Sequence, residues 1–469
     1  MTTEPPNART IDPAELSRLV AEVTGPVLQP GDERYAEEVA TWNLAVAQNP
    51  AVVVGATGPA DVQAAVRFAG LCDLPVAVVA TGHGALVPSD GAVLINLRRM
   101  DGVSIDTQAG TATVGAAADM QSLIDAAAEH GLAPIAGSSP NVGVVGFTLG
   151  GGLSPVLGRA YGYAADHVRC AQIVTPDGVV RHLDAGTEAD LFWAVRGGKG
   201  NFGVVTSLTI DLMPVTRLYG GGLFYDGEHV GAVLDAYRRL AAGATEQLSI
   251  SFAFLRLPPL PFVPEPLRGR FTVHVRVAYL GSAAEGGRLI ADLRASAPRL
   301  IDSVAEMPYT AIAAIHADPV DPVAAYETSS MLRDFPQSAA DMLIAAAGPD
   351  VGSPAMIVEI RQLGGALGRE PEEPNAVGNR DARFQLFAGA AGAPGLGETF
   401  RGALDDLNLA LAPWSTGGKQ INFLSAYDTT PAAVEKAYEP ATYERLVRIK
   451  TAYDPQNLFR INHTIRPRR

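Results

Sequence analysis

Three glycine-rich stretches lie between residues 79 and 205, and they constrain the fold of this 469-residue chain more than any other feature. Their sequences are VATGHGALVPSDG (79–91), AGSSPNVGVVGFTLGGGLS (136–154) and WAVRGGKGNFGVV (193–205). Glycine permits positive φ and lets a ligand approach the main chain closely. Successive N–H groups in such loops form concave anion-binding surfaces that suit a pyrophosphate. One such loop is usually a tight turn, but turns alone explain three of them poorly.

Known nucleotide and hydrolase motifs do not account for these stretches. GGKG is not a Walker A loop, because Trp193 stands in place of its first glycine and Gly200 in place of Ser or Thr. In TLGGGLSP, Pro155 occupies the last position of a G-x-G-x-x-G match. No G-x-S-x-G or H-E-x-x-H sequence occurs, and the eight histidines show no metal-ligand spacing, so we expect no metal site.

Charge and composition limit the classes of molecule that this chain is expected to bind. The net charge of −14 repels phosphate backbones, so we expect neither nucleic acid nor an anionic membrane as a partner. Small-molecule substrates stay open, and nothing indicates the oligomeric state. The polar N-terminus lacks the apolar segment of a signal peptide, and no apolar run reaches the roughly 18 residues of a membrane span, which predicts a cytoplasmic location. Cys72 and Cys170 lie in apolar stretches and are expected to be buried free thiols.

The order of elements predicts an α+β fold. Residues 51–210 alternate short apolar strands with helical patterns, and they include a PDG turn typical of a hairpin. Asp119 is expected to cap the helix that follows it, and Gly131 to end it. After residue 212 the elements lengthen, and FTVHVRVAYLG (271–281) is a clear period-2 strand with two distinct faces.

Four stretches in the same order are similar to the signatures of one family. TGHG, SSPNVGVVGFTLGGGLSPVLGRAYGYAADHV, DLFWAVRGGKGNFGVVT and YERLVRIKTAYDPQNLFRINHTI make the chain resemble the bacterial branch of the berberine-bridge-enzyme-like, or vanillyl-alcohol-oxidase-type, FAD-linked oxidases. The resemblance covers roughly residues 51–467 and is weakest between about 215 and 410. It implies a two-part FAD-binding domain of the PCMH type, residues 1–212 and 426–469. A substrate domain of antiparallel sheet covered by helices, residues 213–425, is inserted between the two parts.

The resemblance assigns His83 as the residue that bonds covalently to the flavin 8α carbon. A neutral imidazole is nucleophilic near neutral pH, and flanking glycines let the flavin edge approach. Some relatives have a second bond from a cysteine, but Ser139 stands at that position and lacks thiolate character, so we expect one covalent bond. Val142 matches the valine that leaves room for O₂ in the family's oxidases.

The same resemblance indicates a wider set of FAD-binding residues along the three loops and the tail. These residues are Ala80, Thr81, Gly82, His83, Gly84, Ala85, Ser139, Pro140, Val142, Gly143, Gly146, Phe147, Gly150, Gly151, Gly152, Leu153, Gly203, Val204, Val205, Asn422 and Asn462.

The implied reaction is hydride removal from a C–H bond of an alcohol, amine or activated carbon, with O₂ reduced to hydrogen peroxide. The substrate is expected to be a small or mid-sized, partly apolar metabolite, in the setting of secondary metabolism. A nearby base takes the matching proton. Many relatives use a tyrosine in a Y-x-N motif, but here Gln420 stands in its place, and only Asn422 persists.

Three other residues are therefore candidates for the catalytic machinery. Glu359 lies in an apolar strand, where burial would raise its pKa toward the useful range for a base. Alternatively, it forms a surface ion pair with Arg361. His274 and Arg276 share one strand face, which looks either toward the flavin or into solvent.

Two other functions stay open. The loss of the motif tyrosine also fits a flavin-fold cyclase or isomerase that catalyses no net oxidation. A flavin-binding protein without turnover is the third alternative, although it would leave the oxidase-type Val142 without a purpose.

Overall fold

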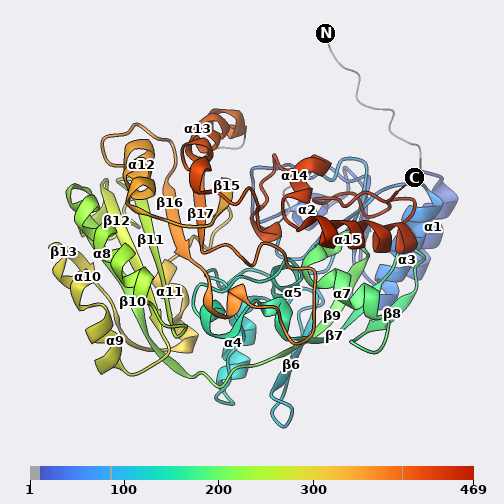
Figure 1. Cartoon of the computed structure of the whole chain (residues 1–469). Helices are drawn as coiled ribbons and strands as arrows, with labels where there is room; N and C mark the ends of the chain where they lie inside the picture. The colour runs from blue at the N-terminus through green and yellow to red at the C-terminus, as the bar shows by residue number, and fades with distance from the viewer. Residues whose placement is uncertain (1–10, 85–86, 393–394, 469) are drawn as a thin grey trace.

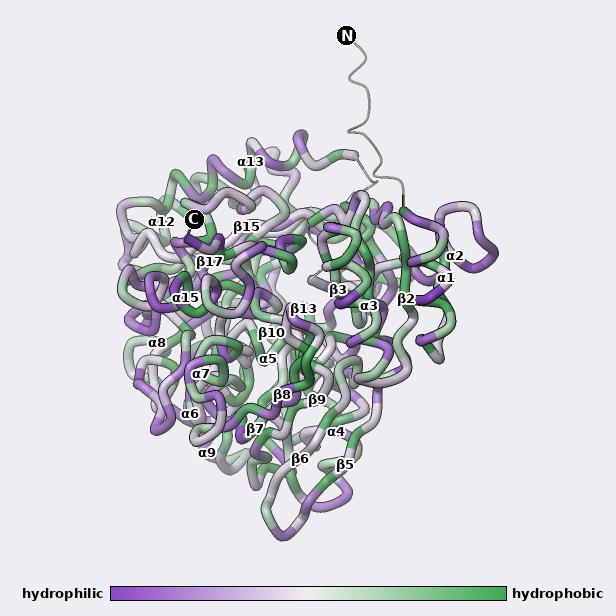
Figure 2. Tube along the Cα trace, turned by 90° about the vertical axis from the view of Figure 1, so that its right-hand side faces the viewer, coloured by the Kyte–Doolittle hydropathy of each residue, from purple (hydrophilic) through white to green (hydrophobic). Residues whose placement is uncertain are grey.

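The computed structural model describes residues 11–84, 87–392 and 395–468. These residues form three sheets, and Figure 1 shows them in two lobes, with the largest sheet and its helices in one and the two smaller sheets in the other. Figure 2 shows apolar segments along interior strands such as β2, with polar segments gathered in peripheral turns such as those around α1 and α2.

A four-stranded sheet has the order β1 (Val27–Leu28), β2 (Val52–Gly55), β4 (Val93–Asn96) and β3 (Val76–Val79). β2, β4 and β3 run parallel, which fits the burial of every residue of β2 and β4. Helix α3 (Pro59–Leu71) connects β2 to β3 and starts with proline in its first turn, where the missing N–H has no helical partner. Helices α1 (Pro13–Glu22) and α2 (Tyr35–Val39) complete this part. β3 ends at Val79, so the first glycine loop follows directly from the carboxyl end of this strand.

A five-stranded antiparallel sheet has the order β5 (Val103–Asp106), β6 (Thr111–Gly115), β9 (Val204–Asp211), β7 (Val168–Val174) and β8 (Val180–Leu183). Helices α4 (Met120–Ala128), α5 (Val144–Leu149) and α7 (Ala189–Gly198) pack against it. The predicted cap is confirmed, because Asp119 accepts from the Ser122 N–H at 2.8 Å. Gly131 has φ +72° just after α4 ends, and residues 176–178 turn the β7–β8 hairpin as predicted.

An eight-stranded sheet forms the second lobe, and all its pairings are antiparallel. Its order is β13 (Arg299–Asp302), β10 (Arg217–Asp226), β12 (Phe271–Tyr279), β11 (Leu248–Arg256), β16 (Ile357–Gln362), β17 (Phe384–Gly392) and β15 (Ala324–Leu332), with β14 (Ala305–Pro308) also paired to β10. The helices that pack against it are α8 (Val230–Gly243), α9 (Ala283–Leu289), α10 (Ala291–Ala295), α12 (Gln337–Ala347) and α13 (Gly397–Ala410). The α+β class and the antiparallel sheet covered by helices are confirmed.

The chain returns to the first lobe at its C-terminal end. Helices α14 (Pro431–Glu435) and α15 (Pro440–Tyr453) follow the second lobe, and α15 lies against α7 (Figure 1). The residues after α15 run beside the third glycine loop, where the Ile465 N–H donates to Asn201 Oδ1 at 2.8 Å. The domain boundaries at residues 212 and 425 stay a prediction.

Two surface properties complete the description. Within the described residues, every helix is too short or too polar to cross a bilayer. Cys72 is partly buried, but Cys170 is exposed, so the prediction of two buried thiols is wrong for Cys170. Cys170 lies at an irregularity in the β7–β9 pairing, which interrupts the alternation that its apolar neighbours suggest.

Candidate cofactor and active site

His83 is held by a hydrogen-bond chain from the second glycine loop. Its Nε2 lies 3.0 Å from Asn141 Oδ1, which also accepts from Ser139 Oγ at 2.8 Å. Asn141 Nδ2 donates to the Val320 carbonyl at 2.7 Å, and this contact fixes which end of the amide faces the histidine. Nε2 therefore carries the proton, and the lone pair of the imidazole is at Nδ1.

The surroundings of His83 keep the ring neutral and fix its plane. Trp42 stacks on the imidazole with ring centroids 4.1 Å apart and 13° between the planes. Burial lowers the pKa of His83 to about 4, and the hydrogen bond to Asn141 only partly opposes this effect. A neutral, oriented imidazole whose lone pair is at Nδ1 is the nucleophilic form of the side chain.

Glycines in the first two loops are required by close packing. Gly82 has φ +82°, and a Cβ there would lie 2.7 Å from the Cα of Thr41. Gly151 and Gly152 also have positive φ, and a Cβ on Gly150 would overlap Asn422 Oδ1 at 1.8 Å. These positions therefore need glycine for the fold, whatever else they do.

Other positions in the same loops face open space. A Cβ at Gly84 or Gly146 would meet no protein atom within 4 Å among the described residues, and both positions are exposed. Gly143 lies beside Thr81, which brings the first two loops together. Since Gly84 is next to His83, a bound ligand can reach the backbone beside the histidine.

The tail connects the second and third loops. Asn422 Nδ2 donates to the Phe147 carbonyl at 2.7 Å. Asn462 Nδ2 lies 3.4 Å from the Gly200 carbonyl, and its buried Oδ1 has no hydrogen-bond partner. A buried acceptor without a partner, beside glycine loops that expose their backbone, fits a large polar cofactor such as FAD.

The remaining predicted cofactor residues occupy three kinds of position. The carbonyls of Pro140 and Val142 accept from N–H groups in the first turn of α4, and the Ala80 carbonyl accepts from Arg98 Nε at 3.3 Å. The side chains of Leu153, Val204 and Val205 are buried in hydrophobic clusters, and Gly203 packs against β7 with φ +151°. Ala85 lies outside the described residues. Cofactor contact by these residues stays a prediction.

The three predicted catalytic residues lie together, on the face of the large sheet opposite its helices. Val273, Val275 and Val277 pack toward the helices, so alternation turns His274 and Arg276 the other way. Both are buried, with exposures of 1% and 3%, so the solvent-facing alternative is wrong. Glu359 is likewise 2% exposed, which excludes a surface ion pair.

The expected pKa shift of Glu359 is wrong in direction. Burial alone would raise its pKa, but Arg361 Nη2 lies 3.1 Å and Arg276 Nη1 3.2 Å from its carboxylate oxygens. These two guanidiniums outweigh burial and hold the pKa of Glu359 well below its usual range. Glu359 is therefore a permanent anion that orients two arginines, which makes it a poor base.

His274 is neutral and confined. Burial, followed by the charge of Arg276, lowers its pKa well below the usual range. Its ring stacks on Phe224 at 3.9 Å between centroids, and a Cβ on Gly222 would lie 2.3 Å from His274 Nε2, so glycine makes room for the ring. Neither ring nitrogen has a hydrogen-bond partner.

Two ionisable residues of the same region were not predicted. Glu327 on β15 faces away from the helices, because its neighbour Thr328 accepts from Asn408 of α13. Burial raises the pKa of Glu327 to about 7, and the charge of Lys199 opposes this shift. Burial lowers the pKa of Lys199 to about 8, and the charge of Glu327 opposes that shift. Lys199 was visible inside the third glycine loop, but no local pattern marked Glu327.

A buried ion pair that sequence reasoning also missed anchors the tail. Lys450 Nζ lies 2.6 Å from Asp454 Oδ2 and donates to the Asn201 carbonyl at 2.7 Å. Asp454 accepts from the N–H groups of Leu458 and Phe459, at 2.7 and 3.0 Å. The i, i+4 spacing of Lys450 and Asp454 in RIKTAYDPQNLF was the sequence pattern that could have predicted this ion pair.

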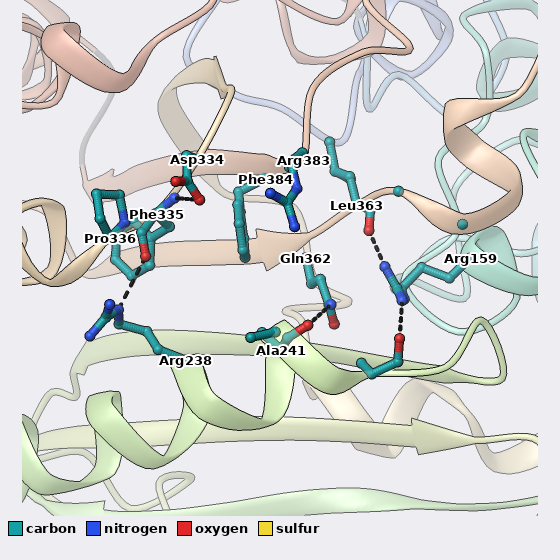
Figure 3. A pocket seen from close by; sticks show the side chains of 14 residues that line it. Arg159, Arg238, Ala241, Asp334, Phe335, Pro336, Gln362, Leu363, Arg383 and Phe384 are labelled. Atoms are coloured by element: carbon teal, nitrogen blue, oxygen red, sulfur yellow. Dashed lines mark hydrogen bonds between the residues drawn. The ribbon is translucent and has the colours of Figure 1, made fainter.

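A cavity of about 460 Å³ lies away from the glycine loops, between α8 and β16 (Figure 3). Two of its three arginines bond main-chain carbonyls: Arg159 bonds those of Leu248 and Leu363, and Arg238 that of Phe335. None of the described residues predicted to bind the cofactor lines it. Nor do the described residues contain a group of three or more His, Cys, Asp or Glu placed to hold a metal.

Comparison with known proteins defines the class. Residues 50–184 match the FAD binding domain family, and residues 420–466 match the family described as berberine and berberine like. The chain is thus an FAD-dependent oxidoreductase. In these two segments it is similar to the berberine-bridge-enzyme-like FAD-linked oxidases, as its loops and tail predicted.

Full-length relatives agree with this assignment. The chain is 29% identical to (R)-6-hydroxynicotine oxidase of Paenarthrobacter nicotinovorans, over 95% of this chain and 97% of that protein. It is 25% identical to an FAD-linked oxidoreductase of Dictyostelium discoideum, with 95% of each covered. Among solved structures, 6-hydroxy-D-nicotine oxidase from Arthrobacter nicotinovorans has a TM-score of 0.79 at 26% identity, covering 95% of this chain and 98% of that one. Chitooligosaccharide oxidase, at 20% identity, shares the fold with a TM-score of 0.81, covering 97% of this chain and 100% of that one.

Proposed function

We propose that the chain is an oxidase whose FAD is attached through His83 alone, as an 8α-histidyl flavin. The observation that carries this proposal is the neutral imidazole of His83, which Asn141 holds through Nε2 at the junction of two glycine loops. Ser139 is engaged with Asn141 and has no thiolate chemistry to offer as a second attachment.

FAD, when bound, accepts a hydride from a substrate C–H bond and passes the electrons to O₂, which gives hydrogen peroxide. The chain's own residues hold the cofactor, orient the substrate and take the proton. We propose that Glu327 is the base that takes the substrate proton, because a carboxyl with a pKa of about 7 suits this role at neutral pH. Arg276 and Arg361, kept charged beside Glu359, are positioning residues.

The substrate is a small or mid-sized metabolite with an apolar part, consistent with secondary metabolism. Phe387 and Phe423 meet edge to face with centroids 5.9 Å apart, beside the polar face of the sheet. Arg361 lies over the Phe423 ring at 5.7 Å. Such a mixed surface suits a ring or short chain that carries a polar group.

A cyclase or isomerase is the second candidate function, favoured by Gln420. This residue stands in place of the family's tyrosine, is 2% exposed and leaves both amide atoms without partners. An amide cannot act as a base, but it can hydrogen-bond a substrate carbonyl. Turnover without bleaching of the flavin under anaerobic conditions would support this function over oxidation.

Acid precipitation tests the covalent attachment. We expect wild-type protein to be yellow and to keep its flavin in the acid pellet, and His83→Ala to release FAD or to lack it. Ser139→Ala is the matched control, because it removes a hydroxyl from the same hydrogen-bond chain and should keep the acid-stable flavin. Acid-stable flavin in His83→Ala would refute the proposal, and a screen of alcohols and amines by oxygen uptake then tests the oxidation.

A further inference from the structure

A small cavity separates the large sheet from the segment that follows the second glycine loop. Ser154, Pro155 and Arg159 form its wall on the loop side. Residues of β11, β12 and β16 form the opposite wall, and His316 of α11 (Ala313–His316) closes one side. The free space, about 10 Å³ for the centre of a water-sized sphere, holds one water molecule or one small ion.

Three arginines line this cavity, and no acidic residue is among the described residues that line it. Arg276 and Arg361 share the single carboxylate of Glu359, which lies outside the lining. Arg159 bonds only main-chain carbonyls, and no carboxylate of the described chain lies within 4.0 Å of it. His316 adds no charge, because burial and then the charge of Arg276 lower its pKa well below the usual range. The positive charge facing the cavity is therefore incompletely balanced.

The lining also holds buried polar atoms without aligned hydrogen bonds. Arg276 Nε and both ring nitrogens of His316 are buried and have no hydrogen-bond partner, and Ser251 Oγ lies near the Glu359 carboxylate without an aligned hydrogen bond. Arg276 Nη1 lies 3.2 Å from Glu359, but this contact is not aligned as a hydrogen bond. Gln362 Oε1 and the unprotonated nitrogen of neutral His316 are acceptors, whereas the arginine atoms can only donate. Buried groups left in this state normally mark an additional bound species.

We propose that this cavity binds one compact monovalent anion of the size of chloride. A water molecule could bond Gln362 but would leave the positive charge unbalanced, and an unpaired buried charge is far more costly than an unpaired neutral group. An anion meets both needs, since arginine and serine supply donors and the charge is offset. The cavity is too small for a polyatomic anion such as sulfate.

The bound anion would act as a bridge between the lobes. Arg159 belongs to α6 (Gly158–Tyr161), on the segment that leaves the second glycine loop, whereas Arg276 and Arg361 belong to the large sheet. One ion between them would hold the polar sheet face against the loop and keep both arginines turned toward Glu359. This role does not depend on covalent flavin attachment.

Halide titration of thermal stability tests the site in the flavin-loaded protein. We expect the melting temperature of wild type to rise saturably when sodium gluconate is replaced by sodium chloride or bromide at constant ionic strength. Arg276→Gln should abolish the rise. Ser251→Ala, which is milder and less prone to misfold, should raise the half-saturating chloride concentration by about tenfold, as loss of one hydrogen bond to a charged group does.

Controls and a direct view complete the test. Arg217→Gln removes an exposed arginine of the same sheet, paired with Glu306 at 2.8 Å, and should leave the chloride response unchanged. A crystal soaked in bromide should show an anomalous peak between Arg276 and Arg159. Water alone in the cavity, or equal stability in chloride and gluconate, would overturn the proposal. Either result would leave the flavin proposal standing, since that proposal rests on acid-stable flavin.

Discussion

At the scale of single residues, the two glycines beside His83 should respond differently to the same substitution. Gly82→Ala places a Cβ 2.7 Å from the Thr41 backbone at φ +82°, so we expect a loss of more than about 2 kcal/mol in the free energy of unfolding. Gly84→Ala meets no described protein atom and should change stability by less than about 0.5 kcal/mol. Urea denaturation measures both.

The same pair separates folding from cofactor access. If the flavin approaches His83 over Gly84, then Gly84→Ala lowers covalent flavin content although the protein remains stable, which the ratio of flavin to protein absorbance reports. Equal destabilisation by the two substitutions would contradict the packing described for Gly82.

Residue chemistry was predictable only where neighbours in sequence determine it. TGHG alone is typical of a tight turn, and it singled out His83 only together with the other two glycine loops and the tail motif. Its tautomer depends on Asn141 and on the Val320 carbonyl, which come from other parts of the chain. The sign of the Glu359 shift depends on Arg276, which β11 separates from β16 in the sheet, so strand order had to be known first.

At the scale of elements, the Lys450–Asp454 pair should hold the tail in place. Both side chains are almost fully buried, so Lys450→Met leaves an uncompensated carboxylate and should cost about 3–5 kcal/mol. It should also lower flavin retention, because Lys450 bonds the Asn201 carbonyl in the third loop. Arg468→Ala removes an exposed pair with Glu444 and should cost less than about 0.5 kcal/mol. A similar cost for both variants would show that the buried pair does not anchor the tail.

Strands and caps were predictable from periodicity, but what covers each face was not. FTVHVRVAYLG separated the valine face of β12 from the face with His274 and Arg276, and β12 spans Phe271–Tyr279 as expected. Period-2 alternation distinguishes the two faces without saying which one meets solvent. Both faces of this strand are buried, one by helices and the other by the rest of the chain, and that second layer depends on contacts distant in sequence.

At the scale of the whole molecule, Lys199 of the third glycine loop and Glu327 of the large sheet influence each other's pKa across the two lobes. If Glu327 is the base, kcat/KM should rise with pH through about 7 as its carboxyl loses a proton. Stability should fall over the same interval. The folded-state pKa is raised above the usual 4.5, so the contribution of the protonated carboxyl is complete below pH 4.5 and is lost as the pH rises through 7.

Three variants separate these effects. Glu327→Gln should remove the rise in kcat/KM near pH 7 and should be more stable than wild type above that pH, by at most about 3 kcal/mol before solvent screening. Lys199→Met removes the charge that holds the pKa of Glu327 down, so the midpoint of the pH profile should move upward. Glu306→Gln, at an exposed carboxylate of the same sheet, should change neither curve. An unchanged pH profile in Glu327→Gln would assign the proton transfer to another group, and an unchanged midpoint in Lys199→Met would show that the two lobes are not coupled through this pair.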